Sequence, residues 1–313
     1  MANEARKPIL TYFLIAVLIL VWLGLELQGG STNTAVLLQW GAQQNALIWQ
    51  GETWRLLTPI FLHIGFPHLA LNSWALYILG RDVEILFGSL RFLVIFLISG
   101  VGGNITYLLL SGSPVTSAGA SGAIFGLFGA LIYFGFRLPP ERRRHFWPAI
   151  AAPVAINLVF GLVNPQINNY AHMGGLLTGW AAALAVGLPR EFRRTSRRLI
   201  GWALLGALAL SAVAASGTAR QRDWGWAYQQ GADAFEAGDY VEASRHFERV
   251  VELRPDLAYA HYALALTYVY QGQWEAALEH AKEAERLDPS QPEAGQLREQ
   301  IEQQLSSDGH TGG

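Results

Sequence analysis

Two residues far apart in the sequence have the chemistry of a nucleophile and a base. Ser121 lies in the string Gly119-Ala120-Ser121-Gly122, and His172 lies in an apolar stretch without a nearby acidic residue. A serine hydroxyl attacks a carbonyl group only when a base removes its proton. An imidazole can take that proton and later deliver it to a leaving group. Ser121 and His172 are therefore candidates for a catalytic dyad.

His68 and Asn72 add two hydrogen-bond donors. They are four residues apart, so they share one face of a helix. Together with the backbone N–H of Ser121 they could hold the oxyanion of a tetrahedral intermediate, where one donor is typically worth about 10²–10³ in rate. The structural alternatives are an interhelical hydrogen bond for Asn72 and an interfacial position for His68.

The glycines near the candidate dyad have two interpretations. Gly122-x-x-x-Gly126 follows the serine, and Gly175-x-x-x-Gly179 follows His172. Small residues at this spacing allow membrane helices to touch backbone to backbone. Considered alone, the serine string is typical of such a packing contact. The same contact would bring the Ser121 hydroxyl and the His172 ring within hydrogen-bond distance.

The residue types argue against a metal site and against a three-residue triad. The chain contains no Cys, and no His-Glu-x-x-His string includes His63 or His68. We therefore expect neither a metal nor a cofactor. Because no carboxylate can orient His172, packing must position its ring. Phe125, one turn after Ser121, is the candidate stacking partner, with ordinary core packing as its alternative.

The elements that must position these residues are membrane helices. Hydrophobic residues make up 51% of the 313-residue chain and charged residues only 15%, against about a quarter in a typical soluble domain. Residues 1–222 carry a net charge of +9 and residues 223–313 a net charge of −11. About 20 apolar helical residues cross a bilayer. Seven stretches approach that length: Pro8–Leu27, His68–Leu86, Phe92–Leu110, Ser121–Phe136, Phe146–Val163, His172–Leu188 and Leu199–Ala215.

Basic residues predict the orientation of these spans. They are concentrated before the first span and around every second connection, which indicates the cytoplasmic side. The candidate site residues then share the external end of their helices, and the seventh span places the C-terminal tail outside. The basic residues are Arg6, Lys7, Arg81, Arg91, Arg137, Arg142–Arg144, Arg190, Arg193, Arg194, Arg197 and Arg198.

The acidic tail contains a helical repeat with a period of 34 residues. Its small and aromatic positions align as Gly231 with Ala265, Gly238 with Gly272, Tyr240 with Trp274, Ala243 with Ala277, Leu253 with Leu287 and Pro255 with Pro289. The tail thus resembles two tetratricopeptide repeats, at about residues 223–256 and 257–290, with a polar capping helix at about 292–305. An unrelated pair of helical hairpins is the alternative. Such repeats typically bind peptides or proteins, and no tail residue suggests catalysis.

Residues 54–187 resemble the rhomboid family of intramembrane serine proteases. The resemblance rests on Trp54-Arg55, Thr58-Pro59, His68-x-x-x-Asn72, Glu84, Gly88, the serine string, and Ala171-His172-x-x-Gly175-x-x-x-Gly179. It implies a six-helix bundle with Ser121 as nucleophile and His172 as general base. His68, Asn72 and the Ser121 N–H would then hold the oxyanion, and Trp54 and Arg55 would shape the external loop. Asn169 occupies a position where several members carry Asp or Asn.

The expected fold class is all-α: a polytopic membrane helix bundle, with a six-helix rhomboid core plus a seventh span over residues 1–217, followed by a soluble tetratricopeptide domain over residues 218–313. The expected function is cleavage of transmembrane substrates in the plasma membrane, with the tail docking substrates or partners and no role for nucleic acid. Three alternatives remain open: an inactive rhomboid-like protein that binds membrane clients, a transporter or channel, and a membrane-anchored scaffold.

Overall fold

The computed structural model describes residues 7–112, 114–164, 167–189 and 195–308. These described residues form helices and no strand, with one isolated antiparallel bridge between Gln43 and Ser117. The chain divides into two compact units. The first unit comprises residues 1–111 and 115–219, and the second comprises residues 112–114 and 220–313. The expected boundary at residues 217 and 218 falls inside one helix, α10 (Thr195–Arg222).

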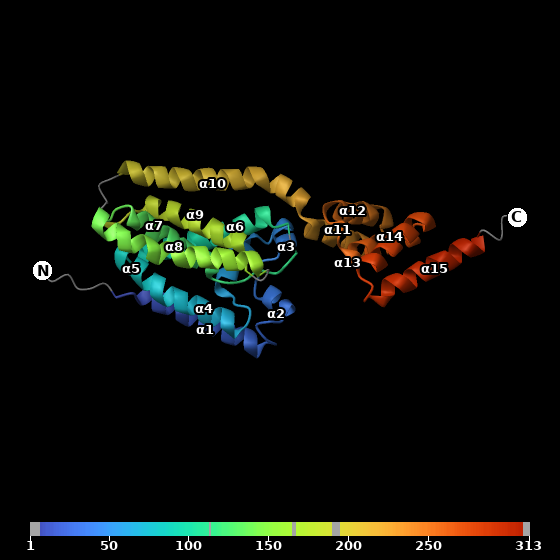
Figure 1. Ribbon diagram of the computed structural model, residues 1–313, viewed down its shortest axis with the longest axis horizontal. Coiled ribbons are helices and arrows are strands. Elements are labelled where there is room, and N and C mark those ends of the chain that lie inside the picture. Colours follow the sequence, from blue (N-terminus) through green and yellow to red (C-terminus); the bar gives the residue numbers. More distant parts are fainter. Residues whose placement is uncertain (1–6, 113, 165–166, 190–194, 309–313) are drawn as a thin grey trace. The chain divides into compact units, whose positions relative to one another are not determined.

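The first unit is a bundle of long apolar helices joined by short helical turns (Figure 1). The segment between α1 and α4 contains α2, α3 and two 3-10 turns, η1 and η2. The elements in chain order are α1 (Ile9–Leu27), α2 (Thr34–Gln39), α3 (Asn45–Trp49), η1 (Thr53–Leu56), η2 (Thr58–Phe61), α4 (Phe66–Ala75), η3 (Leu76–Gly80), α5 (Arg81–Phe87), α6 (Ser89–Leu110), α7 (Ser121–Gly135), α8 (Pro140–Val163), α9 (Asn169–Val186) and α10.

Four of the described helices are long and apolar enough to cross a membrane by themselves: α1, α6, α8 and α10. The other three expected spans do not meet this criterion of length and apolarity, each for a local reason. The second span is divided into α4, a π-helical turn (η3) and α5. The fourth, α7, has only 15 residues, and the sixth, α9, includes Asn169 and His172 in its first turns.

The second span has nearly the expected bounds, since its helical segments run from Phe66 to Phe87 against a predicted His68–Leu86. Arg81 opens α5, the last of these segments. The turn that follows is Gly88 alone, which has a φ of 87° that disfavours a side chain. Glu84 secures this end of the bundle, because its buried carboxylate accepts hydrogen bonds from the Thr11 N–H and hydroxyl at 2.8 Å and from the Ser89 hydroxyl at 2.6 Å.

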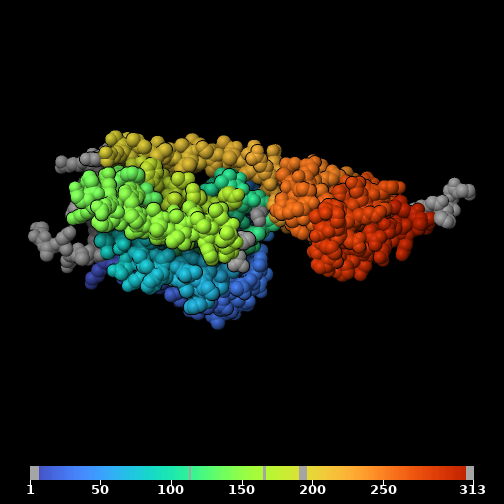
Figure 2. All heavy atoms as spheres, in the orientation of Figure 1, coloured from blue at the N-terminus to red at the C-terminus, as the bar shows by residue number. Residues whose placement is uncertain are grey.

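The core of this unit lies around α6, α7 and α9. Large side chains from α6 and α7, including Phe92, Phe96 and Tyr133, are fully buried. By contrast, α10 lies along an outer edge of the helices of its unit (Figure 2) and has many exposed apolar side chains, among them Trp202, Leu210 and Val213. Because apolar surface of this extent is unfavourable in water, it indicates contact with lipid.

The second unit contains two copies of one helical hairpin, followed by a single helix. Its helices are α11 (Trp224–Glu236), α12 (Tyr240–Leu253), α13 (Ala258–Tyr270), α14 (Trp274–Leu287) and α15 (Pro292–Asp308). The aligned glycines Gly238 and Gly272 both have positive φ, 79° and 75°, directly after the first helix of each hairpin. The aligned alanines Ala243 and Ala277 are completely buried. The 34-residue period thus corresponds to one structural unit.

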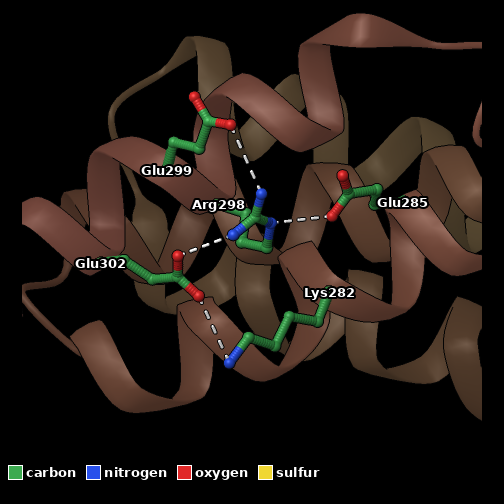
Figure 3. Close-up of polar contacts among 5 residues, drawn as sticks. All are labelled: Lys282, Glu285, Arg298, Glu299 and Glu302. Carbon is green, nitrogen blue, oxygen red and sulfur yellow. Dashed lines mark hydrogen bonds and ion pairs between the residues drawn. The ribbon is translucent and has the colours of Figure 1, made fainter.

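The last helix, α15, covers the end of the repeats. Leu297 and Ile301 pack with Ala277 and Ala281 in one apolar cluster. Beside that cluster, Arg298 holds Glu285 of α14 at 2.8 Å and Glu302 at 2.7 Å (Figure 3). These ion pairs are partly exposed, so each contributes little stability, and the buried apolar face fixes the helix.

Candidate active site

Glycines bring α7 and α9 into direct backbone contact. A Cβ atom added to Gly175 would overlap the Gly122 carbonyl oxygen, and one added to Gly179 would overlap the backbone of Gly126. The two small-residue motifs expected to pack together therefore do so. Helices that approach this closely carry their first turns side by side, which places His172 next to the first turns of α7.

Ser121 is the first residue of α7, and its side chain is half-buried. It follows Gly119, whose φ of 145° is accessible almost only to glycine. The first N–H groups of a helix have no partner within the helix. The start of α7 therefore presents a hydroxyl and backbone donors within an otherwise apolar bundle.

His172 lies in the second turn of α9 and is 5% exposed. Its ring stacks on Phe125, with centroids 4.1 Å apart and planes 8° from parallel. The predicted stacking partner is thus confirmed, and it lies one helical turn from Ser121. The buried Nδ1 of His172 has no hydrogen-bond partner within the described part of the chain. Among the described residues, no direct hydrogen bond joins the Ser121 hydroxyl to this ring.

His68 reaches the same place from α4. Its imidazole lies against the backbone of Gly119, where a Cβ would come within 2.7 Å of Cε1 and 2.8 Å of Nε2. Only glycine at position 119 leaves room for this ring. Asn72 is buried one turn further along, and its amide donates to the His68 carbonyl at 2.9 Å. One of the two Asn72 amide hydrogens is therefore engaged within its own helix.

The structure adds His63, which sequence reasoning considered only as a metal ligand. His63 is completely buried, and its Nε2 accepts the Ala120 N–H at 3.3 Å. Its ring lies 5.2 Å from that of His68 at 65°. His63 therefore supports both the residue before Ser121 and the imidazole beside Gly119. Its position five residues before His68 was the available signal.

Trp54 and Arg55 lie in the loop that precedes α4. Arg55 is buried and donates to the carbonyls of Leu38 and Ala42 at 2.7 and 3.0 Å. Its guanidinium also lies 4.4 Å from the Trp54 ring centroid. Arg55 thus joins the parts of this loop, and Trp54, which is 46% exposed, covers the arginine.

Asn169 faces away from the candidate dyad. Its amide donates to the Leu158 carbonyl of α8 at 3.0 Å, and it lies against Gly161 of the same helix. The neighbouring Asn168, which the sequence did not single out, caps α9 by accepting the Ala171 N–H at 3.0 Å. Asn168 also donates to the Ser117 hydroxyl at 3.2 Å. It thereby links the start of α9 to the segment that leads into α7.

The site combines a hydroxyl, three imidazoles and an amide at one end of an apolar bundle. Across the described ranges, no group of three or more His, Cys, Asp or Glu side chains could hold a metal ion. Polar groups are costly inside a membrane and are typical of functional positions. The residue types suit acyl transfer, in which Ser121 attacks a carbonyl and an imidazole moves the proton.

Comparison with known proteins agrees with this arrangement. The rhomboid domain family matches residues 50–189, and the tetratricopeptide repeat family matches residues 234–301. The rhomboid protease GluP of Bacillus subtilis (strain 168) is 39% identical over 283 residues, which are 90% of this chain and 55% of GluP. The putative rhomboid protease YdcA of the same organism is 34% identical over 190 residues, 59% of this chain and 92% of YdcA. RHOMBOID-like protein 6, mitochondrial, of Arabidopsis thaliana is 35% identical over 174 residues, 53% of this chain and 56% of its own length.

The rhomboid match, residues 50–189, includes every residue placed at the candidate site. The similarity to YdcA covers nearly the whole of that relative, whereas the chain spans 55% of the length of GluP. These matches agree with the all-helical bundle, the apolar spans and the helical repeats described above. The chain is a multi-pass membrane protein that belongs to the rhomboid family of intramembrane proteases and carries a C-terminal tetratricopeptide repeat domain.

Proposed function

We propose that this chain is a serine endopeptidase that cleaves peptide bonds in or near transmembrane segments, with Ser121 as nucleophile and His172 as general base. The observation that best supports this role is the stack of His172 on Phe125, one turn from Ser121, at a backbone contact between α7 and α9. A ring held by stacking keeps its orientation without a carboxylate, which is consistent with a dyad.

The proposed reaction begins when the Ser121 oxygen attacks the scissile carbonyl carbon while its proton passes to the His172 imidazole. The carbonyl oxygen becomes an oxyanion, for which the Ser121 N–H, the Asn72 amide and His68 are the proposed donors. His172 then gives its proton to the leaving amine as the C–N bond breaks. Water, deprotonated by His172, releases the second product from Ser121.

The substrate class follows from where the site lies. Backbone carbonyls of an intact helix are occupied by i→i−4 hydrogen bonds, so a transmembrane segment must unwind locally before Ser121 can reach one. We propose that substrates are transmembrane proteins with a helix-weakening stretch near their outer membrane end. We place the protein in the plasma membrane. The basic loops support an orientation with a cytoplasmic N-terminus. The seventh span, α10, then supports an extracytoplasmic repeat domain.

The deciding experiment is cleavage of a generic transmembrane substrate in liposomes, together with labelling by a fluorophosphonate probe. Wild-type protein should cleave and label, whereas Ser121→Ala should do neither and His172→Ala should lose cleavage. An inactive client-binding protein is the second candidate function. Substrate captured without cleavage, with no labelling of Ser121, would favour it over a protease.

We propose that the repeat domain docks substrates or partner proteins, since stacked helical hairpins expose a continuous surface. Deleting residues 223–313 should leave cleavage of a generic substrate intact but weaken cleavage of natural substrates. A deletion variant that retains every partner captured by the full chain would contradict docking.

A further inference from the structure

The segment of residues 115–120, which leads into α7, has no helical structure of its own. Its position therefore depends on contacts with other parts of the unit. Ser117 exchanges two backbone hydrogen bonds with buried Gln43, each 2.9 Å long, and the Gly119 N–H donates to the Pro59 carbonyl at 2.9 Å. These contacts join the segment to the loop before α4, and they do not involve α9.

Asn168 links this segment to α9. Its Oδ1 atom accepts the Ala171 N–H at 3.0 Å, which caps the start of α9, and its Nδ2 atom donates to the Ser117 hydroxyl at 3.2 Å. The Asn168 carbonyl also accepts the His172 N–H at 3.1 Å. One half-buried side chain thus contacts both the turn that carries the proposed base and the segment before the proposed nucleophile.

The contact with Ser117 is more than the cap requires. A side-chain oxygen is sufficient to cap a helix, and Ser, Asp and Asn do so about equally well. The Nδ2 contact is additional, and it begins at the residue four positions before His172. Its acceptor, Ser117, lies four positions before Ser121. Because a hydrogen bond is directional and acts over a narrow range of distances, this contact constrains how the residues that follow are placed relative to each other.

We propose that Asn168 is a positioning residue for proteolysis: its contact with Ser117 fixes the distance between the side chains of the proposed dyad. The inference rests on the proposed function, because this distance affects catalysis only if the two side chains react. The glycine contact brings α7 and α9 together, and the Asn168 contact sets the register of their first turns. A displacement of about 1 Å between reacting groups can lower a rate about 10²-fold. Loss of the contact should therefore lower kcat with little change in KM.

The test measures cleavage kinetics and fluorophosphonate labelling in liposomes, and thermal unfolding in micelles, with variants of the full chain. Asn168→Ser keeps an oxygen that caps α9 but cannot reach Ser117, whereas Ser117→Ala leaves the cap intact and removes the acceptor. Each should lower kcat and the labelling rate about 10- to 100-fold, with KM and melting temperature close to wild type. The double variant should fall no further than either single variant, because both substitutions remove the same contact.

Asn168→Asp is the conservative variant. Its carboxylate still caps α9 and accepts a hydrogen bond from the Ser117 hydroxyl, so it should retain most of the wild-type rate. Asn33→Ser is the matched control, since Asn33 also caps a helix, α2, by accepting the Ala35 N–H at 3.0 Å. This control should cleave as wild type does.

Wild-type kcat in Asn168→Ser, or losses that multiply in the double variant, would overturn the positioning role. A lower melting temperature of Asn168→Ser with an unchanged labelling rate would also overturn it, and would assign Asn168 to helix capping alone. Failure of the proposed function itself has a different signature, since wild-type protein would then neither cleave the substrate nor react with the probe.

Discussion

Asn72 has a proposed role in oxyanion stabilisation and an observed hydrogen bond within its own helix, and one substitution distinguishes the two roles. If it stabilises the oxyanion, Asn72→Ala should lower kcat about 10²–10³-fold, a loss of roughly 2.7–4 kcal/mol, with little change in KM. Asn157 is a matched control, because its amide also donates to the carbonyl four residues earlier, at 2.9 Å, but on the exposed side of α8. Asn157→Ala should leave kcat unchanged. Equal, small effects of both substitutions would assign Asn72 a purely structural role.

Phe125 should act on catalysis through His172. Replacing it with Leu removes the stacked ring, whose contact is worth about 0.5–1.5 kcal/mol, so kcat/KM should fall by roughly 2- to 10-fold. Phe125→Tyr keeps the aromatic face and should retain most of the activity. A Leu variant as active as the Tyr variant would show that stacking does not position the imidazole.

At the scale of the elements, the close approach of α7 and α9 depends on glycine. Gly175→Val, and even Gly175→Ala, should separate the helices, because the added Cβ overlaps the Gly122 carbonyl oxygen. Overpacking typically costs about 1–3 kcal/mol, so we expect a lower melting temperature together with lost cleavage.

Gly206 in α10 provides the matched control for that substitution, since among the described residues nothing beyond its own helix backbone lies within 4 Å of an added Cβ. Gly206→Ala should preserve activity and stabilise the helix by up to about 1 kcal/mol. Thermal unfolding in micelles and the liposome cleavage assay measure both effects. Wild-type turnover and stability in Gly175→Ala would contradict the role of this backbone contact.

At the scale of the whole molecule, the stability of the repeat domain should depend on pH. In the repeat domain, burial and the neighbouring His261 lower the pKa of His280, while Glu248, Glu279 and Glu283 oppose that shift. The Nδ1 atoms of the two histidines are 3.0 Å apart. Below the ordinary pKa of about 6.5, the unfolded state takes up a proton that the folded state resists. The stability that this group contributes is therefore present above pH 6.5 and is lost as the pH falls.

Hydrogen-exchange protection factors of α13 and α14 in the full chain should decrease between pH 7.5 and pH 5.5. His280→Asn, which keeps a donor near the Nδ1 position without titrating, should remove most of that decrease. A decrease of the same size in the variant would assign the effect to other groups.

The sequence alone was sufficient for the family, the helical class and the repeat, because each depends on spacing along a helix. The intervals Gly122-x-x-x-Gly126 and Gly175-x-x-x-Gly179 fix one face of each helix, so the contact of α7 with α9 and the stack of Phe125 on His172 could be predicted. The 34-residue period predicted the paired turns at Gly238 and Gly272 for the same reason.

Only the tertiary structure decided which loop residues join the site. His63 supports Ala120 across 57 positions of sequence, and Asn168 rather than Asn169 contacts Ser117. No periodicity links these residues, since the path of a loop depends on long-range contacts such as those of buried Arg55. Local spacing in the sequence therefore determined the helices and the faces that pack together. Which loop residues contact which helix ends was decided only by the tertiary structure, because those contacts join residues far apart in the sequence.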